Sequence, residues 1–200
     1  MKYGDLNLGQ IEAIVNKLGG MDGVKGLLSG ALVVVNAVTE KFLELVGTIM
    51  VPATKKFVAT DHFTVDVSAK AEVRIGYLSD SFRNWFLGKT EEPRGTTELN
   101  YQRLRKYSPD KPILDELGDT AETTLGMVWE LLRLQPNGED GGTMLTNGCA
   151  NIFYVRDVNG ELRTVCACLS ADDGWYVSAH SVAGSHGQHA GHRVFSRLPD

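Results

Sequence analysis

Gly174-Trp175-Tyr176-Val177-Ser178-Ala179-His180-Ser181-Val182 is the stretch that decides the fold, because apolar and polar residues alternate along it. Successive side chains of a β-strand point to opposite faces of a sheet. The apolar side chains of Trp175, Val177 and Ala179 therefore share one face, and Tyr176, Ser178 and His180 share the other. The alternation predicts a strand over Trp175 to Val182, with one face directed to a core and the other carrying polar groups.

Two more strands are predicted just before this one. Asn151 to Asp157 and Leu162 to Ser170 flank Asn159-Gly160, which is a strong signal for a two-residue hairpin turn. A second turn at Ala171 to Gly174 leads into the Trp175 strand. The three segments together predict an antiparallel meander.

The faces of the first two strands follow from the same alternation. A two-residue turn at Asn159-Gly160 places Ile152 and Tyr154 on the face of Val165 and Ala167, which also carries Leu169. The opposite face then carries thiol and hydroxyl groups, from Cys166, Cys168 and Ser170. We expect this second face to continue onto Tyr176, Ser178 and His180.

The composition of the C-terminal segment is unusual for a solvated surface. A glycine-rich loop over Ala183 to Gly191 leads to a last strand at Arg193 to Arg197, and no Lys, Glu or Met occurs after Glu161. Four of the five histidines lie in the last 21 residues: His180, His186, His189 and His192. Solvated faces normally carry Lys and Glu. Tyr combined with Ser and Gly is instead the chemistry of recognition loops.

The rest of the chain predicts mostly helices. Helices are expected over about Asp80 to Leu87 with Ser79 as its cap, over Thr97 to Tyr107, and over Ile113 to Leu134, where apolar residues recur at helical spacing. Thr39 to Val46 also favours a helix, whereas Phe57 to Val67 shows strand-like alternation.

Residues 1–38 predict a small helical module followed by a strand. Asn7 caps a first helix that ends at Gly19-Gly20, Asp22 caps a second, and Ala31 to Val38 is rich in β-branched residues. A DNA-binding helix-turn-helix needs several basic residues on its second helix, and Lys25 is the basic residue there. A packing or assembly module is therefore the favoured interpretation.

The run from Gly174 to Val182, together with Gly191-His192-Arg193-Val194-Phe195-Ser196-Arg197, resembles the C-terminal variable region of proteins diversified by retroelements. Those proteins use a C-type-lectin-like fold, and their mutagenesis replaces adenines in Asn-type codons, which yields Tyr, Ser, His, Asp, Gly, Ala, Cys and Arg. The resemblance implies an α+β chain. Residues 39–200 would form a C-type-lectin-like domain of an early strand, two helices and an antiparallel C-terminal meander, whose last strand returns to the early strand. The variable region would span about 165–193. Gln188 falls outside the residue set of such codons.

The function implied by this resemblance is ligand binding, with no catalysis and no cofactor. The expected partner is a protein or surface ligand of unknown identity, and self-association is left open. The residues expected at the binding surface are Cys166, Cys168, Ser170, Trp175, Tyr176, Ser178, His180, Ser185, His186, His189 and His192.

Two other functions compete with this one. His186, His189 and His192 follow each other at intervals of three and supply enough ligands for zinc, either structural or hydrolytic, although no Glu lies near to act as a base. Alternatively, the chain is a structural subunit of a virion or of a surface assembly, which is compatible with display of the C-terminal face.

Charge and hydropathy exclude further classes. A net charge of −5 is unlike that of a nucleic-acid-binding protein. The longest apolar stretch, from Ala31 to Val38, is too short to span a bilayer, and Met1 to Asp5 has no apolar signal core. The three cysteines predict no disulfide framework. We expect the protein in the cytoplasm or in a virion or surface assembly.

Overall fold

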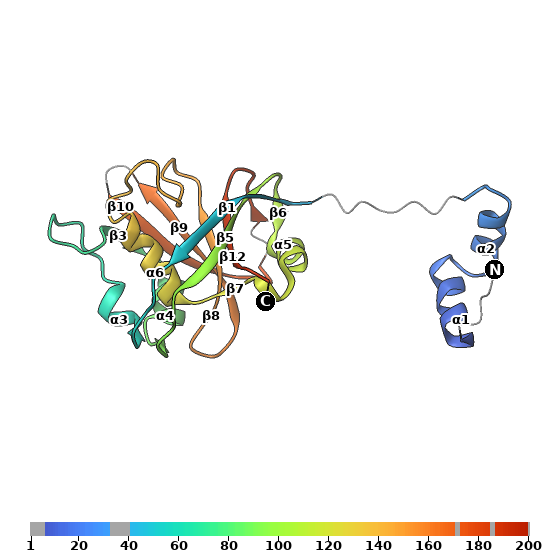
Figure 1. Cartoon of the computed structure of the whole chain (residues 1–200), viewed down its shortest axis with the longest axis horizontal. Coiled ribbons are helices and arrows are strands. Elements are labelled where there is room, and N and C mark those ends of the chain that lie inside the picture. Colours follow the sequence, from blue (N-terminus) through green and yellow to red (C-terminus); the bar gives the residue numbers. More distant parts are fainter. Residues whose placement is uncertain (1–6, 33–40, 171–172, 185–186, 200) are drawn as a thin grey trace. The chain divides into compact units, whose positions relative to one another are not determined.

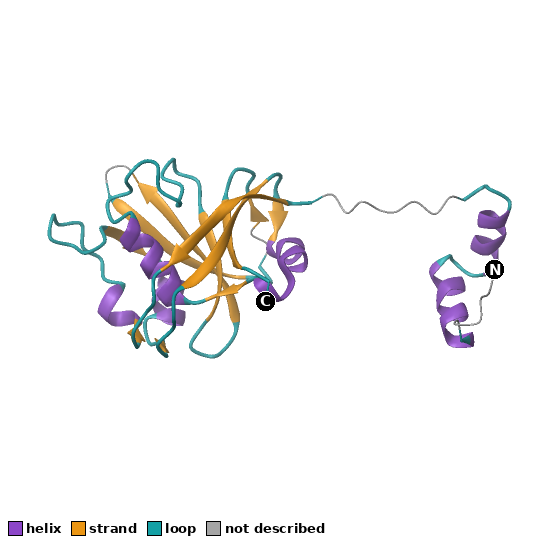
Figure 2. Cartoon of the chain, viewed as in Figure 1, coloured by secondary structure: helices purple, strands orange, loops and turns teal. Residues whose placement is uncertain are grey.

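The computed structural model describes residues 7–32, 41–170, 173–184 and 187–199, and divides into two compact units, Met1–Glu40 and Lys41–Asp200. Figure 1 labels the elements, and Figure 2 shows that strands dominate the second unit. No helix within the described ranges has the length and the apolar run that crossing a bilayer requires.

The first unit contains α1 (Leu8–Lys17) and α2 (Met21–Leu28). Asn7 caps α1 as predicted, because its side chain accepts a hydrogen bond from the Gln10 amide while the Gln10 side chain accepts one from the Asn7 amide. The second helix starts earlier than predicted, with Gly20 as its N-cap and Asp22 in its first turn. The predicted strand over Ala31 to Val38 lies mostly outside the described residues.

The second unit is built on one large mixed sheet. Its strands are β1 (Leu43–Val51), β3 (Ile75–Leu78), β5 (Thr97–Leu104), β7 (Glu122–Thr123), β8 (Asn151–Arg156), β9 (Leu162–Ser170), β10 (Gly174–Ser181) and β12 (Arg193–Arg197). The order is β1-β5-β12-β8-β9-β10-β3, and β7 pairs with β8. The short strands β2 (Phe57–Val58) and β4 (Thr90–Glu91) pair with each other, as do β6 (Ser108–Pro109) and β11 (Gly187–Gln188).

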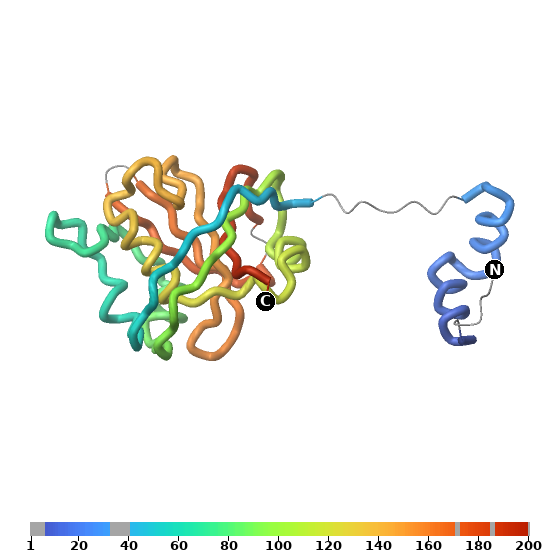
Figure 3. Tube along the Cα trace, viewed as in Figure 1, coloured from blue at the N-terminus to red at the C-terminus, as the bar shows by residue number. Residues whose placement is uncertain are grey.

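The meander β8-β9-β10 is confirmed, but the closing strand is not placed as expected. β12 pairs in parallel with β8 and antiparallel with β5, so β5 separates it from β1. Figure 3 shows this crossing of distant segments, with the red C-terminal strand beside the green β5. The sheet is mixed, because β3 pairs in parallel with β10, and both β12 and β7 pair in parallel with β8.

Helices cover both faces of this sheet (Figure 2). They are α3 (Ala59–His62), α4 (Asp80–Phe86), α5 (Asp110–Leu117), the 3-10 turn Gly118–Thr120 and α6 (Leu125–Leu134). The larger core packs α3, α4 and α6 against Phe153, Val165, Trp175 and their neighbours. A second, smaller core packs α5 against the opposite face, around Ile152, Tyr154 and Cys166.

Three predictions between residues 39 and 134 were wrong. The segment predicted as helical over Thr39 to Val46 enters β1, and its first two residues lie outside the described ranges. The segment predicted as helical over Thr97 to Tyr107 forms β5 as far as Leu104, between two partner strands. Pairing on both sides outweighs the weak helical pattern of these segments. From Phe57 to Val67 only two residues are strand. By contrast, α4 and its Ser79 cap are confirmed, since Ser79 Oγ accepts from the Phe82 amide.

The long helix predicted over Ile113 to Leu134 is interrupted. Gly118 ends α5 with φ +55°, and Thr124 begins α6 by accepting a hydrogen bond from the Met127 amide. Glu91 adds a second cap to α6, because its carboxylate accepts from the Leu125 and Gly126 amides at 2.9 Å each. The apolar periodicity of the sequence continues through this break, so it does not reveal that one helix ends at Gly118 and another begins after Thr124.

Candidate functional site

The pairing of β9 with β10 brings the predicted surface residues together. Tyr176 lies opposite Cys168, Ser178 opposite Cys166, and Gly174 opposite Ser170. Because directly opposed residues share a face, the grouping predicted from alternation is correct for these two strands. We call this side the outer face, defined by Tyr77, Cys168, Ser170, Asp173, Tyr176, Ser178 and His180.

The other side of the same strands lies in the core. Trp175, Val177 and Ala179 are buried, and the Trp175 indole N–H donates to the Gln135 carbonyl at 2.9 Å. The inclusion of Trp175 among the surface residues is therefore wrong. Its ring fixes the start of β10 against the end of α6, and supports the outer face from behind.

The register of β8 against β9 differs from the prediction by one residue. Ile152 lies opposite Cys166 and Phe153 opposite Val165, so Ile152 and Tyr154 share the face of Cys166 rather than that of Val165. The cause is the turn, which is longer than two residues. Gly160 N–H donates to the Asp157 carbonyl, and Gly160 has φ +81°. Such a turn with a following left-handed glycine is the next most common hairpin type.

The shifted register explains why Cys166 is not a surface residue. The thiol packs with Ile152, Tyr154 and Ile113 in the smaller core, and burial raises its pKa. Cys168 is half-buried at the edge of the same core, and burial also raises its pKa. The face predicted to be open is thus covered by α5 at one end, and among its described residues the most exposed side chains lie at the β10 and β3 end.

Two tyrosines dominate the accessible end. Tyr176 on β10 and Tyr77 on β3 have ring centroids 5.6 Å apart, with 38% and 48% of their surfaces exposed. Tyr176 donates its hydroxyl proton to the Asp173 carboxylate at 3.0 Å, and this bond raises the pKa of the phenol. Ser170 Oγ reaches the same carboxylate at 3.5 Å. Tyr77 was not predicted for this surface, because nothing in its short strand indicates parallel pairing with β10.

Ser178 and His180 continue the outer face along β10. Ser178 Oγ lies 3.3 Å from His180 Nε2, and both residues are half-buried. Thr164 faces His180 across the strand pair. The face thus offers hydroxyl, imidazole and phenol groups that donate and accept hydrogen bonds.

The C-terminal loop is anchored by a buried carboxylate. Asp110, at the start of α5, accepts hydrogen bonds from Tyr154 Oη at 2.9 Å, from Thr164 Oγ1 at 2.9 Å and from Gln188 Nε2 at 3.2 Å. Gln188, the residue that departs from the Asn-codon set, is buried. Burial raises the pKa of Tyr154 far above its usual range, and the Asp110 carboxylate adds to this, so the phenol stays a donor.

His189 and His192 lie together in this loop, next to Tyr107. The His189 ring centroid is 5.5 Å from that of Tyr107 and 5.8 Å from that of His192. Burial lowers the pKa of His192, and the neighbouring His189 adds to this, so the imidazole is held neutral. His192 Nδ1 is buried without a hydrogen-bond partner among the described residues. Ser185 and His186, both predicted for the surface, lie outside the described residues.

The part of the chain that the structure describes contains no group of three His, Cys, Asp or Glu side chains placed to hold a metal ion. His189 and His192 supply two of the three predicted zinc ligands, and the third is His186. Comparison with protein-family models, with curated proteins and with solved structures finds no match to this chain.

Proposed function

We propose that the second unit is a ligand-binding domain that presents its outer face to a protein or surface ligand, on a C-type-lectin-like scaffold with diversified surface positions. The exposed pair of Tyr77 and Tyr176 carries the proposal. Tyrosines provide large amphipathic contact area at low cost in conformational entropy. Two of them side by side on an uncovered sheet face are typical of a recognition surface.

Diversification of surface positions is supported by β10, whose side chains alternate between the core and the outer face. Val177 and Ala179 are buried with Trp175, whereas Tyr176, Ser178 and His180 face outward. Replacing an outward residue leaves the core packing unchanged, while the fixed strands keep the surface rigid. The outward residues Tyr, Ser and His also belong to the set that mutated Asn codons produce.

The experiment is a search of the encoding genome for a near-copy of the codons for residues 165–193 beside a reverse-transcriptase gene. We expect mismatches only at adenines of the copy, at the codons for Cys168, Ser170, Tyr176, Ser178 and His180. The codons for Trp175, Val177, Ala179 and Gln188 should be identical in both. Absence of a copy, or mismatches spread evenly over buried codons, would overturn diversification.

A zinc protein is a second candidate, favoured by the adjacent His189 and His192 and by the unpartnered His192 Nδ1. Stoichiometric zinc in the purified chain, lost in a His192→Asn variant, would establish it. Zinc-free protein that folds normally would leave the binding proposal as the better account.

A further inference from the structure

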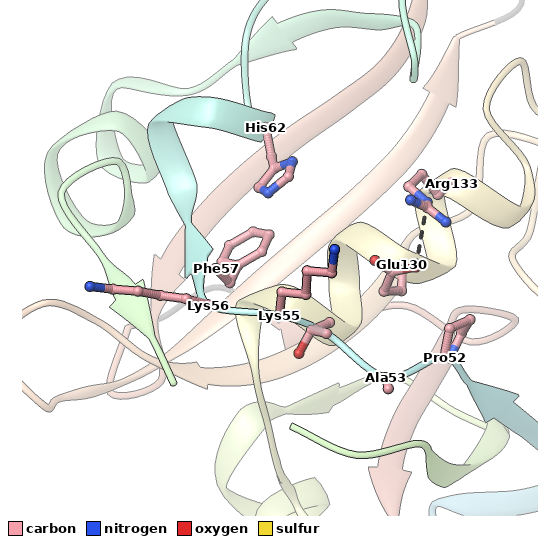
Figure 4. Close-up of a pocket in the computed structure, with 9 residues that line it drawn as sticks. Pro52, Ala53, Lys55, Lys56, Phe57, His62, Glu130 and Arg133 are labelled. Atoms are coloured by element: carbon pink, nitrogen blue, oxygen red, sulfur yellow. Dashed lines mark ion pairs between the residues drawn. The ribbon is translucent and has the colours of Figure 1, made fainter. Parts of the chain in front are cut away.

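A pocket of about 300 Å³ opens between the β1–β2 connection and α6. The wall on one side is formed by residues 52–57, and on the other by His62 of α3 with Glu130 and Arg133 of α6 (Figure 4). The helices α3 and α6 cover the face of the sheet opposite the outer face. The pocket is therefore separate from the proposed binding surface.

The aromatic part of the pocket holds His62 in place. The His62 ring stacks on Phe57 with centroids 4.6 Å apart and an interplanar angle of 11°, and its centroid is 5.0 Å from that of Trp129. Phe57 and Trp129 are both buried, whereas His62 is half-buried. The imidazole is thus fixed by packing at the rim with its nitrogen atoms near the opening (Figure 4).

The acidic groups beside the pocket are already paired. Glu130 is buried and lies 3.4 Å from Arg133, which also contacts Glu72 at 3.3 Å. Burial raises the pKa of Glu130, and Arg133 opposes this shift. One guanidinium therefore contacts two carboxylates and balances one of their two charges, and the raised pKa of Glu130 favours its neutral form.

The lysines of the pocket have no such partners. Lys55 and Lys56 are exposed, and within the described ranges neither forms an ion pair. Figure 4 shows the Lys55 amino group directed to the opening between His62 and Glu130, and Lys56 directed away. Although the net charge of the chain is −5, this pocket is lined by Lys55, a cation without an ion-pair partner among the described residues, and by the His62 imidazole.

We propose that this pocket binds a small molecule carrying a phosphate group, with the Lys55 ammonium and a His62 ring N–H contacting its oxygens. A lysine is a compact point charge that suits phosphate, and a neutral or charged imidazole donates a hydrogen bond to it. The volume is at the lower end of small-molecule sites, which fits a phosphomonoester of a small alcohol or sugar. Pro52 and Ala53 provide apolar contact for the remainder.

The test is a titration of the full chain with glucose 6-phosphate, followed by backbone amide NMR at constant ionic strength, with glucose as the neutral control. We expect saturable shifts confined to residues 52–62 and 129–133, and none with glucose. Lys55→Gln should weaken binding by about two- to fivefold. The matched variant Lys111→Gln removes the same charge from α5, on the opposite face of the sheet, and should bind like the original.

Glu130→Gln distinguishes a phosphate pocket from one for an amine. Removing a negative charge beside the site should tighten phosphate binding, whereas an amine ligand would lose its counter-charge. Weaker binding in Glu130→Gln, equal weakening in Lys55→Gln and Lys111→Gln, or no saturable shift would each overturn the proposal. Unchanged resonances of β8 and β9 verify that each variant is folded.

Discussion

At the scale of the residue, burial separates the three cysteines more sharply than sequence spacing does. Cys166 is buried in the smaller core, Cys168 is half-buried at its edge, and Cys149 is half-buried before β8. Only the thiolate form reacts with alkylating reagents, so a thiol with a raised pKa reacts slowly. Burial raises the pKa of both Cys166 and Cys168.

We therefore predict a fixed order of alkylation at pH 8. Iodoacetamide should modify Cys149 first, Cys168 more slowly, and Cys166 only after unfolding in urea. Mass spectrometry of peptides from timed samples measures the three rates. Modification of Cys166 at the rate of Cys149 in the native chain would show that α5 does not cover it.

Alternation in the sequence was sufficient to sort residues of β9 and β10 into two groups, but not to say which group is covered. Trp175 and Cys166 were both expected at a surface and both are buried. Cys166 belongs to a face that looks polar in the sequence but is covered by α5 in the structure. The position of α5 depends on contacts between residues more than 40 positions apart, such as Asp110 and Tyr154. Tyr77 was missed for the same reason.

At the scale of the element, the Asp157 side chain determines the β8–β9 hairpin. Its carboxylate accepts from the Asn159 and Glu161 amides at 2.8 and 3.0 Å and from Arg163 Nε at 2.9 Å. These bonds stabilise a five-residue connection in place of the two-residue turn that Asn159-Gly160 predicts. A register change of one residue moves every side chain to the other face. The Asp157 carboxylate thereby favours the register that places Tyr154 on the face of Cys166.

Replacing this carboxylate should destabilise the chain. Asp157→Ala removes three hydrogen bonds and should lower the free energy of unfolding by roughly 1 to 3 kcal/mol. Urea unfolding followed by circular dichroism measures the change, and the exposed Asp115→Ala is the control. A loss no larger than that of the control would mean that other contacts set the turn.

The same residue predicts a pH dependence. Burial acts to raise the pKa of Asp157. Hydrogen bonds from Arg163, Glu161 and Asn159 lower this pKa by more than burial raises it, so the pKa is below its ordinary value. A lowered carboxyl pKa contributes stability that is present above the unfolded pKa of about 4 and is lost as the pH falls through the folded pKa. The difference in stability between Asp157→Asn and the original chain should therefore shrink below pH 4.

Elements with local signals were predicted best. The caps at Asn7 and Ser79 act within a single turn, and α1 and α4 form where those caps indicate. β5 was predicted as a helix, because its identity depends on pairing with β1 and β12, which lie far away in sequence. Intrinsic preference is a weak guide where two partner strands supply the backbone hydrogen bonds.

At the scale of the whole molecule, both hydrophobic cores lie within the second unit. Their residues run from Phe42 to Phe195, whereas α1 has no buried residue and α2 buries only Gly23. Leu8, Met21 and Leu28 are exposed, with 85%, 60% and 82% of their surfaces accessible. Helices of this length are marginal in water without packing partners.

We predict that residues 41–200 fold without the first unit. A chain beginning at Lys41 should unfold within about 2 °C of the full chain, because no core residue is removed. A peptide of residues 1–32 should be mostly unstructured in dilute solution. Circular dichroism melts of both test this, and a clear loss of melting temperature on truncation would show that the two units stabilise each other.

The Asp110 network also has a consequence for the order of events during folding. Its three hydrogen bonds join residues 44, 54 and 78 positions apart, so each must wait for a long loop to close. The Gln188 bond spans the longest interval and lies near the C-terminus. We expect α5 to dock on β8 and β9 before the loop around Gln188 is secured. The loop around Gln188 would then be the last part of the sheet's surroundings to lock, and its bond to Asp110 would seal a core that has already formed.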